Sequence, residues 1–242
     1  RPQYLCSAPI SSSKHLKPWN ILKAGMKYVF DKSGPLAETY AVAGGFLKTD
    51  KTLEVPDAQV VLLSALGPAK TGGAGYKIRD LLPDEHGFGL TVYQGSRRSR
   101  GSVTLRSPDP FDQPLITSGY FSDPHDMEVL KTAVKKMRKM MKQPAISQFI
   151  EKELAPGGDI EDDISLEKEI RRNGATAYHQ CASCAMGPED DSVLNEKLQV
   201  RGIDKLRIAD ASVMPRIPNA ALHAPSMMIG EKAAALIKGE II

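Results

Sequence analysis

The chain has 242 residues, 41% of them hydrophobic, so it is long enough and apolar enough to bury the core of one large domain or two smaller ones. Its 32 basic and 29 acidic residues give a net charge of +3, which does not indicate a polyanionic partner such as nucleic acid. No apolar run reaches the about 18 residues that a membrane-spanning helix needs. Three cysteines, Cys6, Cys181 and Cys184, are too few for a disulfide framework and more typical of a reducing compartment, although many secreted enzymes also have few cysteines.

The first half of the chain is expected to contain an antiparallel sheet. Residues 1–19 are rich in Ser, Pro and Lys and are expected to be irregular, whereas apolar positions at helical spacing predict a helix over residues 20–30. Apolar or alternating stretches indicate strands over residues 58–66, 88–94 and 102–106, and a polar turn joins the last two. Neighbouring strands joined by short turns favour antiparallel pairing.

A long helix with one apolar side is expected after these strands. Asp123 supplies an N-cap acceptor and Pro124 occupies the first helical position, while Pro144 ends the helical pattern. Apolar residues recur at steps of three and four, which leaves basic residues on the opposite side. These basic residues are Lys131, Lys135, Arg138 and Lys142. The basic run at residues 135–139 is therefore expected to be a solvated face.

The last third of the chain is expected to mix helices with short strands. A helix is predicted from Ser165 to Arg172, short strands over residues 198–200 and 206–208, and a final helix over residues 226–238. The apolar residues of the final helix are Met227, Ile229, Ala233, Ala234 and Ile237. Their spacing predicts that this helix packs into a core.

Two local motifs have the spacing of known sites but lack the remaining parts of those sites. Cys181 and Cys184 form a C-x-x-C pair, as in redox dithiols and zinc half-sites, but no second C-x-x-C or H-x-x-x-H pair completes a zinc site. Local or buried cysteines are the favoured interpretation, and no metal is expected. The glycine-rich residues 72–75 lack the G-x-G-x-x-G spacing of a phosphate-binding turn and are expected to form a flexible loop.

His179 and His223 are the candidates for chemistry. An imidazole with an ordinary pKa of about 6.5 can take and return a proton at neutral pH. His223 precedes Ala224 and Pro225, where the final helix is expected to open, and a helix N-terminus offers amides and partial positive charge to an anionic group. On the residues alone, the alternative that each histidine is a surface or satisfied core residue stays open.

Three spaced segments resemble a known family. They run from His179 to Gly187, from Leu198 to Pro215 and from His223 to Ala234. Together they resemble the C-terminal signature of the glucose-methanol-choline (GMC) oxidoreductases, and residues 99–110 resemble the family's second characteristic stretch. Shorter landmarks at residues 34–36 and 45–47 follow the same order. The resemblance therefore covers nearly the whole chain.

The resemblance implies an α/β (α+β) fold, with an antiparallel-sheet substrate domain, flanking helices and the C-terminal piece of a Rossmann-like FAD-binding domain. Residues 1–165 would form the substrate-binding domain, with an irregular segment at residues 1–19, and residues 166–242 would complete the FAD-binding domain. The family's N-terminal strand, glycine-rich turn and helix are not found in this sequence, which begins at Arg1. The expected partner is therefore a missing N-terminal FAD-binding half.

The resemblance also implies FAD as the cofactor and oxidation of an alcohol CH–OH group by hydride transfer to flavin N5, with oxygen or another electron acceptor. His179 matches the general base, and His223 matches the position that orients the substrate oxygen. Asp210 and Ala211 match a strand end that contacts the cofactor. The residues that match the helix start facing the flavin are His223, Ala224, Pro225 and Ser226.

Departures from the family pattern leave alternatives open. Ala182 and Ser183 stand where the family usually has Gly-Thr, and Cys181 replaces a small aliphatic residue, which puts the shape of the substrate pocket in doubt. A flavin-containing hydroxynitrile lyase of the same fold is an alternative, and so is an inactive truncated relative that acts as a binding or assembly module. A light-driven fatty-acid decarboxylase is disfavoured, because its diagnostic residues differ from a pair of histidines.

Overall fold

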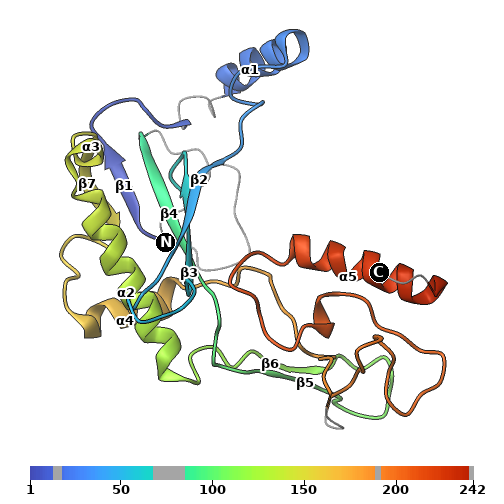
Figure 1. Ribbon diagram of the computed structural model, residues 1–242. Helices are drawn as coiled ribbons and strands as arrows, with labels where there is room; N and C mark the ends of the chain where they lie inside the picture. The colour runs from blue at the N-terminus through green and yellow to red at the C-terminus, as the bar shows by residue number, and fades with distance from the viewer. Residues whose placement is uncertain (13–17, 68–84, 189–191, 240–242) are drawn as a thin grey trace. The chain divides into compact units, whose positions relative to one another are not determined.

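The computed structural model of the protein describes residues 1–12, 18–67, 85–188 and 192–239 (Figure 1). The glycine-rich residues 72–75 lie outside these described residues. Among the described helices, none is long and apolar enough to cross a membrane.

The chain forms two compact units, and each unit contains two separate stretches of sequence. Unit 1 consists of Arg1–Gln94 and Met127–Thr176, and unit 2 consists of Gly95–Asp126 and Ala177–Ile242. The chain therefore leaves unit 1 after the first strands, contributes one segment to unit 2, and returns. The expected assignment of substrate and FAD-binding domains, divided at residue 165, is a functional division and stays a prediction.

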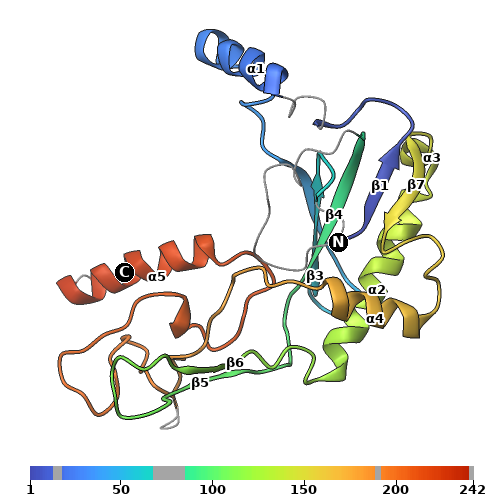
Figure 2. The same cartoon turned by 180° about the vertical axis from the view of Figure 1, so that it is seen from behind.

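Unit 1 is built on a five-stranded antiparallel sheet with the order β2-β3-β4-β1-β7 (Figures 1 and 2). The strands are β1 (Gln3–Cys6), β2 (Ala41–Leu47), β3 (Ala58–Leu63), β4 (Gly87–Gln94) and β7 (Ile150–Ala155). The predicted strands at residues 58–66 and 88–94 are confirmed as β3 and β4, which pair in antiparallel register from Ala58 opposite Gln94.

Two predictions for the strands are wrong. The segment expected to be irregular contains β1, whose four residues are all buried between β4 and β7, so its short apolar run is stabilised by pairing on both edges. The strand predicted at residues 102–106 forms as β5 (Ser102–Thr104), but it pairs with β6 (Leu115–Thr117) in a separate hairpin of unit 2 and not with β4.

Two helices of unit 1 cover one face of its sheet. They are α2 (Pro124–Met141), of which all but the first turn lies in unit 1, and α4 (Asp163–Asn173). Their apolar sides meet the sheet in one core, whose buried residues are Tyr4, Val60, Leu90, Val134, Met137, Met141 and Leu166. Two further helices are α1 (Pro18–Asp31), which matches the helix predicted over residues 20–30, and the short α3 (Pro144–Ser147).

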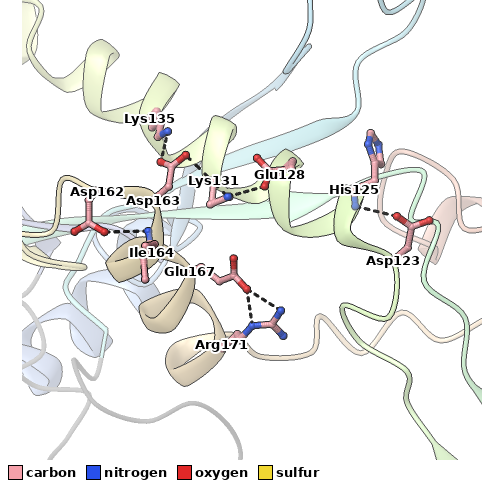
Figure 3. Close-up of polar contacts among 10 residues, drawn as sticks. All are labelled: Asp123, His125, Glu128, Lys131, Lys135, Asp162, Asp163, Ile164, Glu167 and Arg171. Atoms are coloured by element: carbon pink, nitrogen blue, oxygen red, sulfur yellow. Dashed lines mark hydrogen bonds and ion pairs between the residues drawn. The ribbon is translucent and has the colours of Figure 1, made fainter.

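The start of α2 is as predicted, with Pro124 as its first residue and the Asp123 carboxylate accepting the His125 N–H at 2.9 Å (Figure 3).

The prediction that the basic side of α2 is solvated is wrong for two of its basic residues. Lys131 is 7% exposed, and its ammonium lies 2.6 Å from Glu128 Oε1 and 4.0 Å from Asp163 Oδ2 (Figure 3). Arg138 is half-buried against Glu153 of β7. Ion pairing across α4 and β7 therefore offsets the desolvation of these charges.

Unit 2 has few regular elements and its own core. It contains the β5–β6 hairpin, a short 3-10 helix η3 (Ala211–Val213) and the terminal helix α5 (His223–Lys238). Its buried core residues are Leu194, Leu198, Val213, Met214, Leu222, Ile229 and Ala233. The strands expected at residues 198–200 and 206–208 are replaced by isolated bridges, one of which joins Gln199 to Arg207.

Helix α5 begins three residues before the predicted start, because Leu222 and not a later residue is its N-cap. The prediction that this helix packs into a core is correct for Ile229 and Ala233, which are buried. It is wrong for Ala234, which is exposed, and for Met227 and Ile237, which are 62% and 68% exposed within the chain. One side of α5 therefore packs in unit 2, while the other presents apolar side chains.

Candidate functional site

A hydrogen bond joins the side chain of His179 to the residue before His223. The N–H of Leu222 donates to Nδ1 of His179 at 3.4 Å, and Leu222 immediately precedes His223. Although 43 residues separate His179 from Leu222, both lie in unit 2. The segment that carries His179 and the start of α5 are therefore neighbours in the fold.

The segment after His179 is tied to the turn at residues 210–214. The N–H of Cys184 donates to the carbonyl of Ser212 at 3.1 Å, and the N–H of Met186 donates to the carbonyl of Val213 at 2.9 Å. Because the Val213 side chain is fully buried in the unit 2 core, this turn is a fixed support. The three motif segments found in the sequence thus meet in one region of unit 2.

Asp210 and Ala211 lie at the start of η3. The Asp210 carboxylate is the N-cap and accepts the Ser212 N–H at 2.7 Å, and Ala211 packs against the unit 2 core. Hydrogen bonds from Ser212 lower the pKa of Asp210 below its usual range, since they favour the charged form of the carboxylate. Asp210 itself is exposed.

We expect the Asp210 cap to make the stability of unit 2 pH-dependent. Because its folded-state pKa is lowered, the contribution is present above about pH 4, and it is lost as the pH falls through the folded-state pKa. In urea unfolding followed from pH 7 to pH 2.5, Asp210→Asn should be less stable than the parent chain at pH 7 and nearly equal to it at pH 2.5. A difference between the two chains that does not change with pH would contradict this role.

The first turn of α5 contains the other predicted cofactor-contacting residues, His223, Ala224, Pro225 and Ser226. The N–H groups of His223 and Ala224 lie in the first turn of α5, where the helix offers no carbonyl to accept them, and Pro225 has no N–H. The Ser226 N–H donates to the Leu222 carbonyl at 2.9 Å, which closes the turn. This turn therefore offers two amides and the positive end of a helix dipole to an anionic or electron-rich group.

The two histidines differ in their surroundings. His179 is half-buried, and the Leu222 contact occupies its Nδ1, so Nε2 is the ring nitrogen left for a reactant. His223 is exposed at the first position of α5. His179, anchored through Nδ1 in a segment that contacts the start of α5, has the ring chemistry to bind a hydroxyl group and exchange its proton.

The cysteines of the C-x-x-C pair are free and half-buried. Burial raises the pKa of the Cys181 thiol, and the charges of Arg100 and Arg97 oppose this shift, so the thiolate is disfavoured at neutral pH. Cys181 also packs against the unit 2 core, as the favoured interpretation of these cysteines expects. Among the described residues, no group of three or more histidines, cysteines or acidic residues is arranged to hold a metal ion.

Sequence reasoning missed the contact that holds the turn before His223. The Ser96 hydroxyl donates to the Asn219 side-chain oxygen at 2.6 Å, and Gly95 lies directly against Asn219. The Asn-Ala-Ala sequence before Leu222 gave no pattern that would identify a distant partner. The one signal in the sequence was a Gly-Ser pair after a strand, and such a pair is typical of an ordinary turn.

A family model described as GMC oxidoreductase matches residues 97–230. The oxygen-dependent choline dehydrogenase of Pseudomonas savastanoi pv. phaseolicola is 35% identical over 238 residues, which cover 98% of this chain and 40% of that protein. The protein of the same name from Escherichia coli is 34% identical, over 98% of this chain and 41% of its own length. The chain thus spans about two-fifths of the length of these curated relatives.

A solved structure also matches nearly the whole chain. Formate oxidase from Aspergillus oryzae RIB40, studied for modification of its FAD, aligns with a TM-score of 0.83 at 22% identity, over 98% of this chain and 45% of that one. At this identity the match shows the fold. The fold class expected from the sequence, mixed helices and antiparallel sheet, is confirmed.

Proposed function

Because the chain belongs to the GMC oxidoreductase family, whose model matches more than half of its length, we propose that it is the C-terminal part of an FAD-dependent enzyme that oxidises the CH–OH group of an alcohol. The observation that carries this proposal is the hydrogen bond from Leu222 N–H to His179, which joins the His179 segment to the start of α5. Relatives named choline dehydrogenase and formate oxidase support the oxidoreductase class.

In this proposal His179 exchanges the hydroxyl proton of the substrate at Nε2. General acid–base catalysis requires a group that can reach the transferred proton, and an imidazole held through Nδ1 can present Nε2 to a bound hydroxyl group. At 3.4 Å the Leu222 contact is long for a hydrogen bond, so it orients the ring without strongly fixing one neutral tautomer. His223 orients the substrate oxygen and shares its developing negative charge.

The residues present fit a flavin. The His223 and Ala224 amides at the start of α5 would face the electron-rich edge of its ring system, and Asp210 and Ala211 at the η3 turn would contact it from the adjacent segment. When bound, the flavin would supply the hydride acceptor for the carbinol carbon. The side chains of this chain would then bind the alcohol, exclude water from it and move its proton.

We propose the N-terminal FAD-binding part as the partner of unit 2. Exposed apolar side chains on α5 and on the β5–β6 hairpin support this partner, since a polypeptide that covered them would remove them from water. These side chains are Met227, Met228, Ile237, Val103 and Ile116.

The proposal is tested with the complete polypeptide and a panel of alcohols that includes choline, benzyl alcohol and simple primary alcohols. We expect the purified protein to contain FAD and to convert at least one alcohol to its carbonyl product, with oxygen or an artificial dye as electron acceptor. Cyanide release from a cyanohydrin without flavin reduction would instead support a hydroxynitrile lyase. A folded, flavin-free protein that oxidises no alcohol would support a binding or assembly module.

A further inference from the structure

Asn219 is fixed in place by the two residues that follow β4 in the sequence. The Ser96 hydroxyl donates to its Oδ1 at 2.6 Å. A Cβ atom at Gly95 would lie 2.9 Å from the Asn219 Cα, closer than side-chain atoms normally approach a backbone. Only glycine at position 95 therefore allows the backbone of Asn219 to come this near.

The segment that holds Asn219 is itself anchored. The Asp126 carboxylate, whose residue is 2% exposed, accepts the N–H groups of Arg98 and Ser99, both at 3.0 Å. The Ser99 hydroxyl in turn accepts the Asp123 N–H at 3.1 Å. Ser96 thus projects from a short segment that a buried carboxylate holds through two backbone bonds, so it is a rigid support for Asn219.

Leu222 lies three residues after Asn219, and it is fixed on its other side. Its side chain is 4% exposed in the unit 2 core, and its carbonyl accepts the Ser226 N–H as α5 begins. The Leu222 N–H points at His179 Nδ1 from between these two supports. The position of that N–H is therefore set by α5 from one side and by Asn219 from the other.

We propose that Asn219 is a positioning residue for His179: held by Gly95 and Ser96, it keeps the turn at residues 219–222 where the Leu222 N–H reaches Nδ1 and orients the ring. The functional part of this inference rests on the proposed role of His179 in proton exchange. Its structural part concerns the imidazole alone and does not depend on any activity.

The ring nitrogens report the structural part directly. A donor against Nδ1 sets the chemical environment of that ring nitrogen. With selective 15N-histidine labelling of the 242-residue chain, which has five histidines, the His179 Nδ1 resonance can be followed in the parent chain and in each variant. Asn219→Ala and Ser96→Ala should each shift this resonance, because the Leu222 N–H no longer reaches Nδ1, while Asn219→Asp, which keeps the acceptor oxygen, should retain the parent position.

A matched control separates this effect from a general loss of stability. Asn195 holds another turn of unit 2, where its Oδ1 accepts the N–H groups of Lys197 and Gln199, both at 3.0 Å. Asn195→Ala should lower the urea midpoint about as much as Asn219→Ala and leave the His179 resonances unchanged. Unchanged His179 resonances in Asn219→Ala, or an equal change in Asn195→Ala, would overturn the proposal.

The kinetic part uses the flavin-loaded complete polypeptide. Asn219→Ala should lower kcat by about tenfold with little change in KM, because a misoriented acid–base group weakens the chemical step more than substrate binding. Asn219→Asp should restore most of the loss, and Ser96→Ala combined with Asn219→Ala should be no worse than either alone. A kcat of Asn219→Ala at or above the parent value would overturn the positioning role. A parent protein that oxidises no alcohol would instead count against the proposed function. The NMR result would then decide the structural part alone.

Discussion

Replacing His179 with alanine is expected to lower kcat for alcohol oxidation by roughly 100- to 10,000-fold, the range typical of a lost general acid–base group. FAD should stay bound, because the amides at the start of α5 and the η3 turn are backbone features that this change leaves in place. The rate is measured in the complete polypeptide with the best alcohol of the panel, and flavin content is read from the absorbance spectrum.

His125→Ala is the matched control for this variant. His125 lies in the first turn of α2, where the contact that holds it uses its backbone N–H and not its ring, so its loss should change kcat less than twofold (Figure 3). His179→Gln serves as a second variant, since it keeps a polar side chain of similar length without an imidazole and should be nearly as slow as the alanine variant. Full activity in both His179 variants would remove this residue from the proton transfer.

The second large effect is expected on stability, in Arg138→Met. The Arg138 guanidinium forms a two-point ion pair with Glu153, whose shortest distance is 2.6 Å, and it also donates to the carbonyls of Gly157 and Ile160 at 2.9 and 2.7 Å. The two charged side chains are only 16% and 12% exposed. Methionine would leave the Glu153 charge with little water and no counter-charge, so we expect the free energy of unfolding to fall by about 3 kcal/mol.

Chemical denaturation at pH 7 measures this loss. Lys139→Met on the same helix removes an exposed positive charge and should change stability by less than about 0.5 kcal/mol. Adding Glu153→Gln to Arg138→Met should recover part of the loss, because it removes the unpaired charge. Equal effects of Arg138→Met and Lys139→Met would show that the pair behaves as a surface ion pair.

Elements with strong local signals could be predicted from the sequence. The N-cap Asp123 with Pro124 after it places the start of α2 at the correct residue, because both signals act within one turn. Strands β3 and β4 were found because each has at least six residues of apolar or alternating character.

Elements that depend on distant partners could not be predicted. Strand β1 has four residues in a polar neighbourhood, and it exists because β4 and β7 pair with its two edges. Lys131 and Arg138 have the spacing of an exposed helical face, yet α4 and β7 bring Asp163 and Glu153 to them. Helical periodicity identifies which residues share a side of a helix, but it does not reveal what later packs on that side.

The candidate site shows the same limit. His179 and His223 were singled out by residue type, by their segments and by the family resemblance, and the structure connects their segments through Leu222. No sequence pattern indicated that a main-chain N–H would make this connection. The support from Ser96 to Asn219 spans 123 residues and depends on how unit 2 folds, so single-sequence reasoning had no access to it.

The most direct test of the proposed function is anaerobic rapid mixing of the complete flavoprotein with its best alcohol and with the same alcohol deuterated at the carbinol carbon. We predict that the oxidised-flavin absorbance bleaches in a single turnover, and that deuteration slows the bleaching severalfold because the C–H bond breaks in that step. Flavin absorbance that stays unchanged with every alcohol of the panel, or bleaching at the same rate with both isotopic forms, would contradict oxidation by hydride transfer at this site.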